Sequence, residues 1–246
     1  MKLIHKTIFA IALWAGTGTA MAQETKSGET TSGNAENETK VLVGKPYFGN
    51  SLDGMIFSTA LINNSGAKSL GTLRFTAFAH VGFTYNYNIN KHIGIYTGLD
   101  VKNIGLIEKF DIQNVTVKDR VYTLGVPVGL RFGNMPKRNY FFLGGGLDLP
   151  FHYKHKIWTD VQSKTKFNDW FSDYTNVFMP YLFAGIGVKG TTLKVQYYPD
   201  NFFNENKSVG TSATGQPIKI FANKKVNLLL VSIGRDMNFG KKKKKK

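Results

Sequence analysis

Hydrophobic and polar residues alternate along most of the chain beyond about Tyr47. In the longest run, residues 72–88, every odd-numbered position is apolar or aromatic, and every even-numbered position except Phe78 is polar or glycine. A period of two places successive side chains on opposite faces of a β-strand. The run therefore predicts one strand with one apolar face, about three times as long as a typical strand in a globular protein.

The same pattern recurs and predicts eight strands in all. One face of each strand is apolar, and the other is rich in glycine with scattered charges, too irregular for a hydrophobic core. Long strands with a continuous apolar face are typical of a barrel wall that faces lipid. The expected strands cover residues 54–62, 72–88, 91–101, 122–132, 141–153, 178–189, 193–198 and 226–239.

Short and long connections alternate between these strands. Tight turns are expected at residues 88–91, 134–138 and 189–191, and polar loops at 63–71, 108–119, 154–175 and 200–224. Outer-membrane barrels have short turns on the periplasmic side and long loops outside, whereas soluble barrels point their apolar faces inward. The expected fold is all-β, an eight-stranded antiparallel up-and-down transmembrane β-barrel.

The inward faces carry charges that a barrel interior must neutralise. An eight-stranded barrel is just wide enough for side chains to fill, and buried charges require partners. We therefore expect a plugged lumen with a charge network and no wide pore. The residues expected in this network are Arg74, Asp100, Arg131, Asp148 and Lys194.

The N-terminal segment has the features of an export signal. Two lysines precede a short apolar stretch at residues 8–15, and Ala20-Met21-Ala22 has the pattern of a cleavage site. The alternative, a membrane anchor, requires a longer apolar run. We expect a signal peptide at 1–22, a flexible periplasmic linker at 23–46, the barrel at 47–240 and a polylysine tail at 241–246. The absence of cysteine excludes disulfides and thiolate metal sites.

The chain is strongly basic. Its formal net charge is +16, and removing the two leader lysines and the six tail lysines still leaves about +8. For an exported protein this favours outer-membrane lipid, lipopolysaccharide or cell-wall polyanions as partners, and not nucleic acid. Alternatively, the basic loops serve solubility. Trp158, Trp170 and Phe171 lie among lysines in one long loop and are candidates for contact with lipopolysaccharide or a protein, or for anchoring a loop that caps the barrel.

Three patterns were considered as catalytic or binding sites. His152 and His155 are three residues apart and so face opposite sides of a strand, which argues against a metal site. An acyl hydrolase acting on lipid A would need a serine near His152, but neither Ser163 nor Ser172 lies in a nucleophile elbow. The glycine run 144–146 lies within a strand, not before a helix, unlike a phosphate loop. We expect no catalytic, metal-binding or cofactor-binding residues and no enzyme activity, with lipid A modification as the alternative.

The last strand carries a short motif with a polar residue, a glycine and two hydrophobic residues. Ser232, Gly234, Met237 and Phe239 match the signal of barrels that are folded by the barrel assembly machinery. The resemblance implies that this strand closes the barrel and that the machinery is a partner. The family signal usually ends the chain, whereas here a glycine and six lysines follow.

Two further stretches, residues 84–99 and 122–133, resemble small PorT-like and OmpA/OmpX-like outer-membrane barrels of Bacteroidota. The resemblance implies an eight-stranded barrel in the outer membrane of a Gram-negative bacterium. We expect a non-enzymatic barrel with a structural or ligand-binding role through extracellular loops. The alternative from the PorT-like resemblance is a component of a protein secretion apparatus, with other envelope proteins as partners.

Overall fold

The computed structural model describes residues 43–159, 164–212 and 214–238. The expected signal peptide, most of the expected linker, Phe239 and the lysine tail lie outside these ranges. No helix in the described ranges is long and apolar enough to span a membrane.

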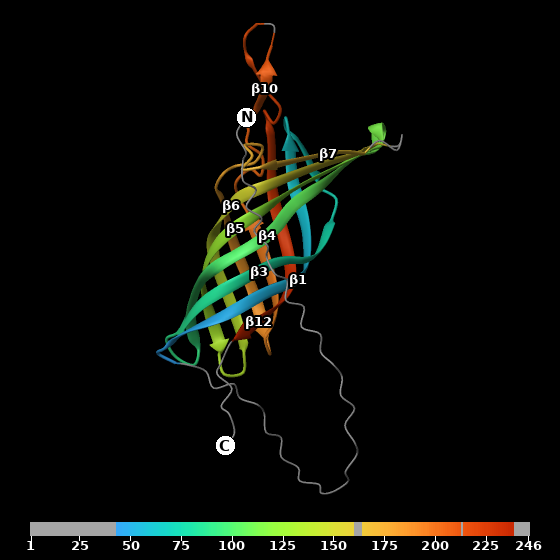
Figure 1. The fold of residues 1–246 in the computed structure, drawn as a ribbon. Coiled ribbons are helices and arrows are strands. Elements are labelled where there is room, and N and C mark those ends of the chain that lie inside the picture. Colours follow the sequence, from blue (N-terminus) through green and yellow to red (C-terminus); the bar gives the residue numbers. More distant parts are fainter. Residues whose placement is uncertain (1–42, 160–163, 213, 239–246) are drawn as a thin grey trace, which may run out of the picture. The chain divides into compact units, whose positions relative to one another are not determined.

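Eight strands form a closed antiparallel ring (Figure 1). Each strand of the ring pairs with the next one along the chain, and the last pairs with the first from Gly49 opposite Asn238 to Asn64 opposite Lys224. This confirms the expected eight-stranded up-and-down barrel. In ring order the strands are β1 (Pro46–Asn64), β3 (Arg74–Asn88), β4 (Ile93–Phe110), β5 (Val115–Asn134), β6 (Asn139–Thr159), β8 (Met179–Val188), β9 (Thr191–Tyr198) and β12 (Lys224–Asn238).

The expected loops contain more strand than the sequence indicated. β4 and β5 run well past their expected ends and meet at a short 3₁₀ turn, η1 (Asp111–Gln113), while β6 continues to Thr159. The expectation of irregular loops at 108–119 and 154–175 was wrong, because these segments pair by backbone hydrogen bonds without needing an apolar stripe. The additional strands are β2 (Ala67–Leu70), β7 (Lys164–Trp170), β10 (Ser208–Thr211) and β11 (Pro217–Lys219).

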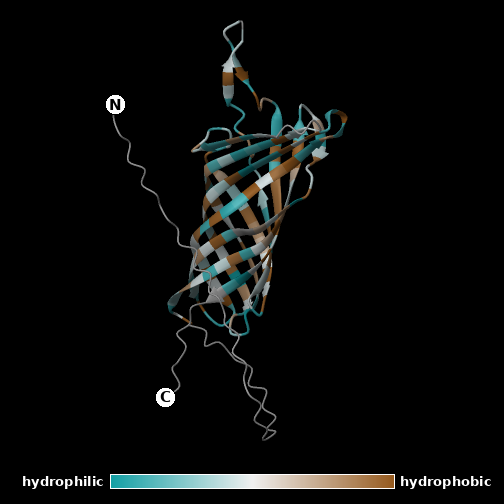
Figure 2. Ribbon diagram, turned by 45° about the vertical axis from the view of Figure 1, so that its right-hand side comes forward, coloured by the Kyte–Doolittle hydropathy of each residue, from teal (hydrophilic) through white to brown (hydrophobic). Residues whose placement is uncertain are grey.

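Large apolar side chains cover the outside of the ring, and hydropathy alternates along its strands in Figure 2. Phe83 and Val128, for example, are 66% and 56% exposed. A surface of this kind is unfavourable in water but matches the lipid-facing wall of a membrane barrel. We call it the apolar belt; its residues include Val81, Phe83, Leu99, Val101, Leu124, Val126, Val128, Leu130, Leu143, Leu147, Leu149, Leu182, Ile186, Leu193, Val195 and Ile233.

Glycines on the inward face make room for aromatic rings. The ring of Tyr96 lies against Gly129, and the ring of Tyr181 lies against Gly146, each so close that a Cβ at the glycine would overlap it. Phe183 packs between the two tyrosines, with ring centroids 6.2 Å and 6.0 Å away. The interior is therefore filled by large rings opposite residues that lack side chains.

Candidate functional site

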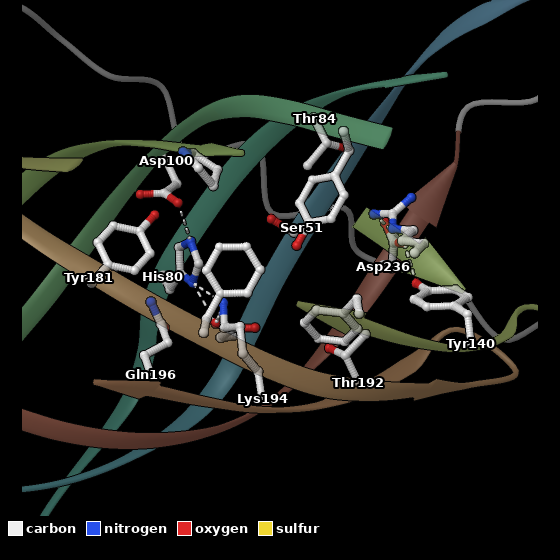
Figure 3. Close-up of a pocket in the computed structure, with 16 residues that line it drawn as sticks. Ser51, His80, Thr84, Asp100, Tyr140, Tyr181, Thr192, Lys194, Gln196 and Asp236 are labelled. Atoms are coloured by element: carbon white, nitrogen blue, oxygen red, sulfur yellow. Dashed lines mark hydrogen bonds and ion pairs between the residues drawn. The ribbon is translucent and has the colours of Figure 1, made fainter. Parts of the chain in front are cut away.

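A chain of ion pairs crosses the middle of the lumen (Figure 3). His80 of β3 lies between Asp53 of β1, which contacts its Nδ1, and Asp100 of β4, whose Oδ2 is 3.1 Å from its Nε2. Lys194 of β9 places its Nζ 2.7 Å from Asp53. All four side chains point into the barrel from different strands, so only the closed ring brings them together.

The chain of ion pairs continues to the opposite wall. Lys102 Nζ is 2.7 Å from Asp148 Oδ1, 3.6 Å from Asp100 Oδ1 and 3.6 Å from the centroid of the Tyr181 ring. The Tyr198 hydroxyl donates to Asp148 at 2.6 Å. Three carboxylates thus face two lysines and His80. We call these six residues the central cluster: Asp53, His80, Asp100, Lys102, Asp148 and Lys194.

A second ionic group lies toward the end of the barrel that carries the short turns. Arg131 Nη2 is 3.1 Å from Asp236, and its Nη1 donates to Asn86 at 2.7 Å. The Arg131 guanidinium lies 4.3 Å from the centroid of the Tyr96 ring. The Tyr140 hydroxyl donates to Asp236 at 2.6 Å. Charge and hydrogen bonding therefore tie β3, β4, β5, β6 and β12 together at this level.

A small cavity lies between the two groups. It has a volume of about 60 Å³ and is lined by hydroxyls of Ser51, Thr84 and Thr192 as well as by aromatic rings (Figure 3). A cavity of this size, with polar groups in a largely apolar lining, has room for a few water molecules. The described part of the lumen thus holds ion pairs, aromatic rings, buried aliphatic side chains and small cavities.

The lumen residues named from the sequence are distributed between these features. Asp100, Asp148 and Lys194 belong to the central cluster, and Arg131 belongs to the second group. Arg74 is buried near the outer end, where it donates to the Asn103 side chain at 2.6 Å, not to a carboxylate.

Four charged lumen residues were missing from the expected network. Asp53 was missed because the first strand has a weak pattern, and Lys102 because it lies one position past the expected end of its strand. His80 has the same parity as Arg74, which was assigned to the lumen, and Asp236 has the same parity as the motif residues Ser232 and Gly234. Parity counting along longer strands would have found Lys102, His80 and Asp236. It would not have found Asp53, because a register shift between Asp53 and Met55 reverses the alternation of β1.

The assembly motif lies in the closing strand, β12. Ser232 donates to Asp53 at 3.1 Å, and Gly234 packs against the same aspartate. Met237 pairs with Asn50 of β1 through the backbone. The inward half of the motif thus contacts the central cluster, while recognition by the assembly machinery stays a prediction.

The candidates for loop contacts lie on or beside strands. Trp158 belongs to β6 and Trp170 to β7, contrary to the expected loop, and Phe171 follows directly with its side chain 82% exposed. Trp170 stacks on His152 with ring centroids 4.2 Å apart. The β6–β7 hairpin is therefore an ordered platform beyond the apolar belt.

His152 and His155 lie on opposite faces of this hairpin. His152 faces outward beside Trp170, whereas His155 faces inward with its Nδ1 2.6 Å from Asp119. The hydrogen bond to Asp119 raises the pKa of His155, against the opposing effect of burial. In the described residues, no group of three or more histidines and acids is arranged to hold a metal ion.

The closed ring, the apolar belt and the filled lumen define a transmembrane β-barrel. No family model matches the sequence, and no curated protein matches it.

Several solved structures are similar to this chain at low identity and low TM-score. Ail, the attachment invasion locus protein of Yersinia pestis, is 14% identical, with 77% of this chain and 99% of that chain covered and a TM-score of 0.33; that structure holds the heparin analogue sucrose octasulfate. Neisserial surface protein A is 13% identical over 78% and 97% of the two chains, with a TM-score of 0.39. The N-terminal β-barrel domain of Pseudomonas aeruginosa OprF is 10% identical over 76% and 99%, with a TM-score of 0.27.

Proposed function

We propose that this protein is an outer-membrane barrel of a Gram-negative bacterium that acts without catalysis, by binding an envelope ligand or partner at its outer rim. One observation carries the proposal. Strands β4, β5 and β6 continue past the apolar belt, and β7 extends them into a paired platform, while ionic groups fill the lumen below. These features favour a binding surface at the outer rim over a transport channel through the lumen.

Of the residues considered for lipid A hydrolysis, His152 and Ser172 have other contacts, and Ser163 lies outside the described residues. His152 is stacked between Tyr122 and Trp170. Asp173, the acidic residue next to Ser172, forms an ion pair with Lys207, with 2.5 Å between Oδ1 and Nζ. The Ser172 hydroxyl accepts a hydrogen bond from the backbone of Tyr174 at 3.2 Å. This arrangement favours a binding role over an acyl-transfer site, in which nucleophile, base and acid contact one another.

The PorT-like resemblance supports a second candidate, a subunit of a protein secretion apparatus. The stretches that carry it form the β3–β4 hairpin and most of the membrane part of β5. This candidate predicts a secretion defect on deletion of the gene and co-purification with other envelope proteins, which a ligand-binding barrel does not require.

The first experiment is electrophoresis of purified outer membranes with and without boiling. A folded barrel shifts its mobility on boiling, and N-terminal sequencing of the same band tests cleavage before Gln23. A single unshifted band from the soluble periplasm would contradict the membrane assignment.

The binding role is tested by shortening the platform. Replacing residues 155–167 by Asn-Gly leaves Lys154 and Asn168, which are paired in the structure, to flank a two-residue turn. The shortened barrel is expected to retain its boiling shift and to lose captured envelope ligands in a cross-linking pull-down. A shortened barrel that captures the same ligands as the full chain would exclude the platform as the binding surface.

A further inference from the structure

The outward side chains of β5, β6 and β7 beyond the apolar belt form rows across the strands, three of which carry the argument. The register places Lys118 opposite Lys156, which lies opposite Lys166, and Arg120 opposite Lys154. We call these five residues the cationic rows. The row nearest the belt consists of Tyr122, His152 and Trp170, and we call it the aromatic row.

The cationic rows place side chains of like charge opposite one another on neighbouring strands. Like charges directly opposite each other on neighbouring strands destabilise a sheet. The row positions hold no acidic side chain, and the next outward position on β7 in the Arg120 row is Asn168. Burial, followed by the charges of Arg74, Arg120 and Lys156, lowers the pKa of Lys118. Positive charge is therefore concentrated on this outer face, as expected for a site that takes up an anion.

The aromatic row is a stacked layer beneath these charges. His152 lies between Tyr122 and Trp170, with centroid distances of 5.6 Å and 4.2 Å. Lys154 Nζ lies 5.2 Å from the centroid of the Tyr122 ring. Amphipathic rings in this position are typical of the boundary between hydrocarbon and headgroups.

The height of the rows above the belt identifies the kind of ligand. Leu124 is the first belt residue below Tyr122 on β5, and Arg120 lies four residues above Leu124. Four residues correspond to about 13 Å along a strand and to roughly 9–10 Å along the membrane normal at barrel tilt. Headgroup layers are roughly 5–8 Å thick on each side of the hydrocarbon. Counted from Leu124, the Arg120 row therefore lies at or just above the outer edge of the headgroup layer, and its side chains face sideways, away from the barrel axis.

We propose that the cationic rows bind the phosphate groups of a glycolipid of the outer leaflet, whose acyl chains lie against the apolar belt. The proposal rests on the outer-membrane location in the proposed function, and it names the ligand class of the rim. Lipid is favoured over a soluble polyanion because the rows adjoin the aromatic row and the belt without interruption, so that one molecule can contact all three.

The test measures binding of diphosphoryl lipid A to the mature full-length barrel in detergent by isothermal titration. Dephosphorylated lipid A and inorganic pyrophosphate serve as the comparison ligands. The wild type is expected to bind the diphosphoryl form at least tenfold more tightly than either. The variant Lys118→Gln/Arg120→Gln/Lys154→Gln should bind it about 100-fold more weakly, since each basic residue near an anionic surface contributes roughly a factor of five.

A matched control removes the same charge from the other end of the barrel. Lys45→Gln/Lys91→Gln/Lys189→Gln changes three exposed lysines at or before the short turns and should leave binding unchanged. Lys118→Arg/Lys154→Arg keeps the charge and should retain binding. Trp170→Ala should weaken binding of the lipid.

Three results would overturn the proposal. They are equal binding by the wild type and the triple Gln variant, pyrophosphate binding as tight as lipid A binding, and preference for a soluble sulfated polysaccharide that Trp170→Ala does not affect. A boiling shift in every variant confirms folding and separates these results from failure of the proposed function, in which the wild type itself shows no shift.

Discussion

The ammonium nitrogen of Lys102 lies 2.7 Å from a carboxylate oxygen of Asp148. Lys102 belongs to β4 and Asp148 to β6, and these two strands are not neighbours, because β5 lies between them. The contact passes over Gly125, where a Cβ would overlap the carboxylates of Asp100 and Asp148. Inward charges on β4 and β6 can therefore contact each other across β5, because the β5 residue between them is a glycine without a side chain.

Removing Lys102 should destabilise the barrel strongly. Lys102→Met leaves Asp148, which is fully buried, without its cation, and breaking a buried pair typically costs about 3–5 kcal/mol. The measurement is the urea midpoint of the boiling shift for the barrel refolded in lipid vesicles. The double variant Lys102→Met/Asp148→Leu should recover most of the loss, and equal midpoints for Lys102→Met and wild type would show that the pair contributes nothing.

Adding a side chain beneath an aromatic ring should also destabilise the fold. Gly129→Val places methyl groups where the Tyr96 ring lies, and overpacking of this kind costs about 1–3 kcal/mol. Gly54→Ala is the control, because a Cβ at Gly54 has no atom within 4 Å. Equal unfolding midpoints for Gly129→Val and Gly54→Ala would mean that the rings are not packed as described.

A charge in the apolar belt distinguishes lipid from water as its surroundings. Val128 is an exposed belt residue, and Val128→Lys should cost about 2–4 kcal/mol if it lies near the middle of the bilayer. The same substitution on a surface that faces water stays within about 0.5 kcal/mol. Thr116→Lys, beyond the belt on the same strand, is the control and should be nearly neutral in vesicle refolding.

The His155–Asp119 pair should make the rim sensitive to pH. The pKa of His155 is raised in the folded state, so its contribution to stability is complete below the ordinary value of 6.5 and is lost as the pH rises through the raised value. Hydrogen exchange of β6–β7 amides should therefore become faster relative to intrinsic rates as the pH rises from about 6.5 through the raised pKa of His155. In His155→Gln this pH dependence should disappear, and its persistence would assign the effect to another group.

Much of the barrel could be predicted from the sequence, because lipid imposes a period of two that every membrane strand must obey. The parity of residues 72–88 alone indicates which side chains face lipid and which face the lumen. The inward positions of Asp100, Arg131 and Asp148 follow from the same count. The ends of the strands could not be predicted in the same way, because β4, β5 and β6 continue beyond the belt, where no apolar stripe is required.

The pairing of charges was decided only by the tertiary structure. Parity places Lys194 in the lumen, but only the closed ring brings it to Asp53, because partners are set by register and by strands far apart in the sequence. The cationic rows arise in the same way. Along the chain Lys118 and Lys156 are separate charges in two expected loops, and cross-strand hydrogen bonding makes them neighbours on one face.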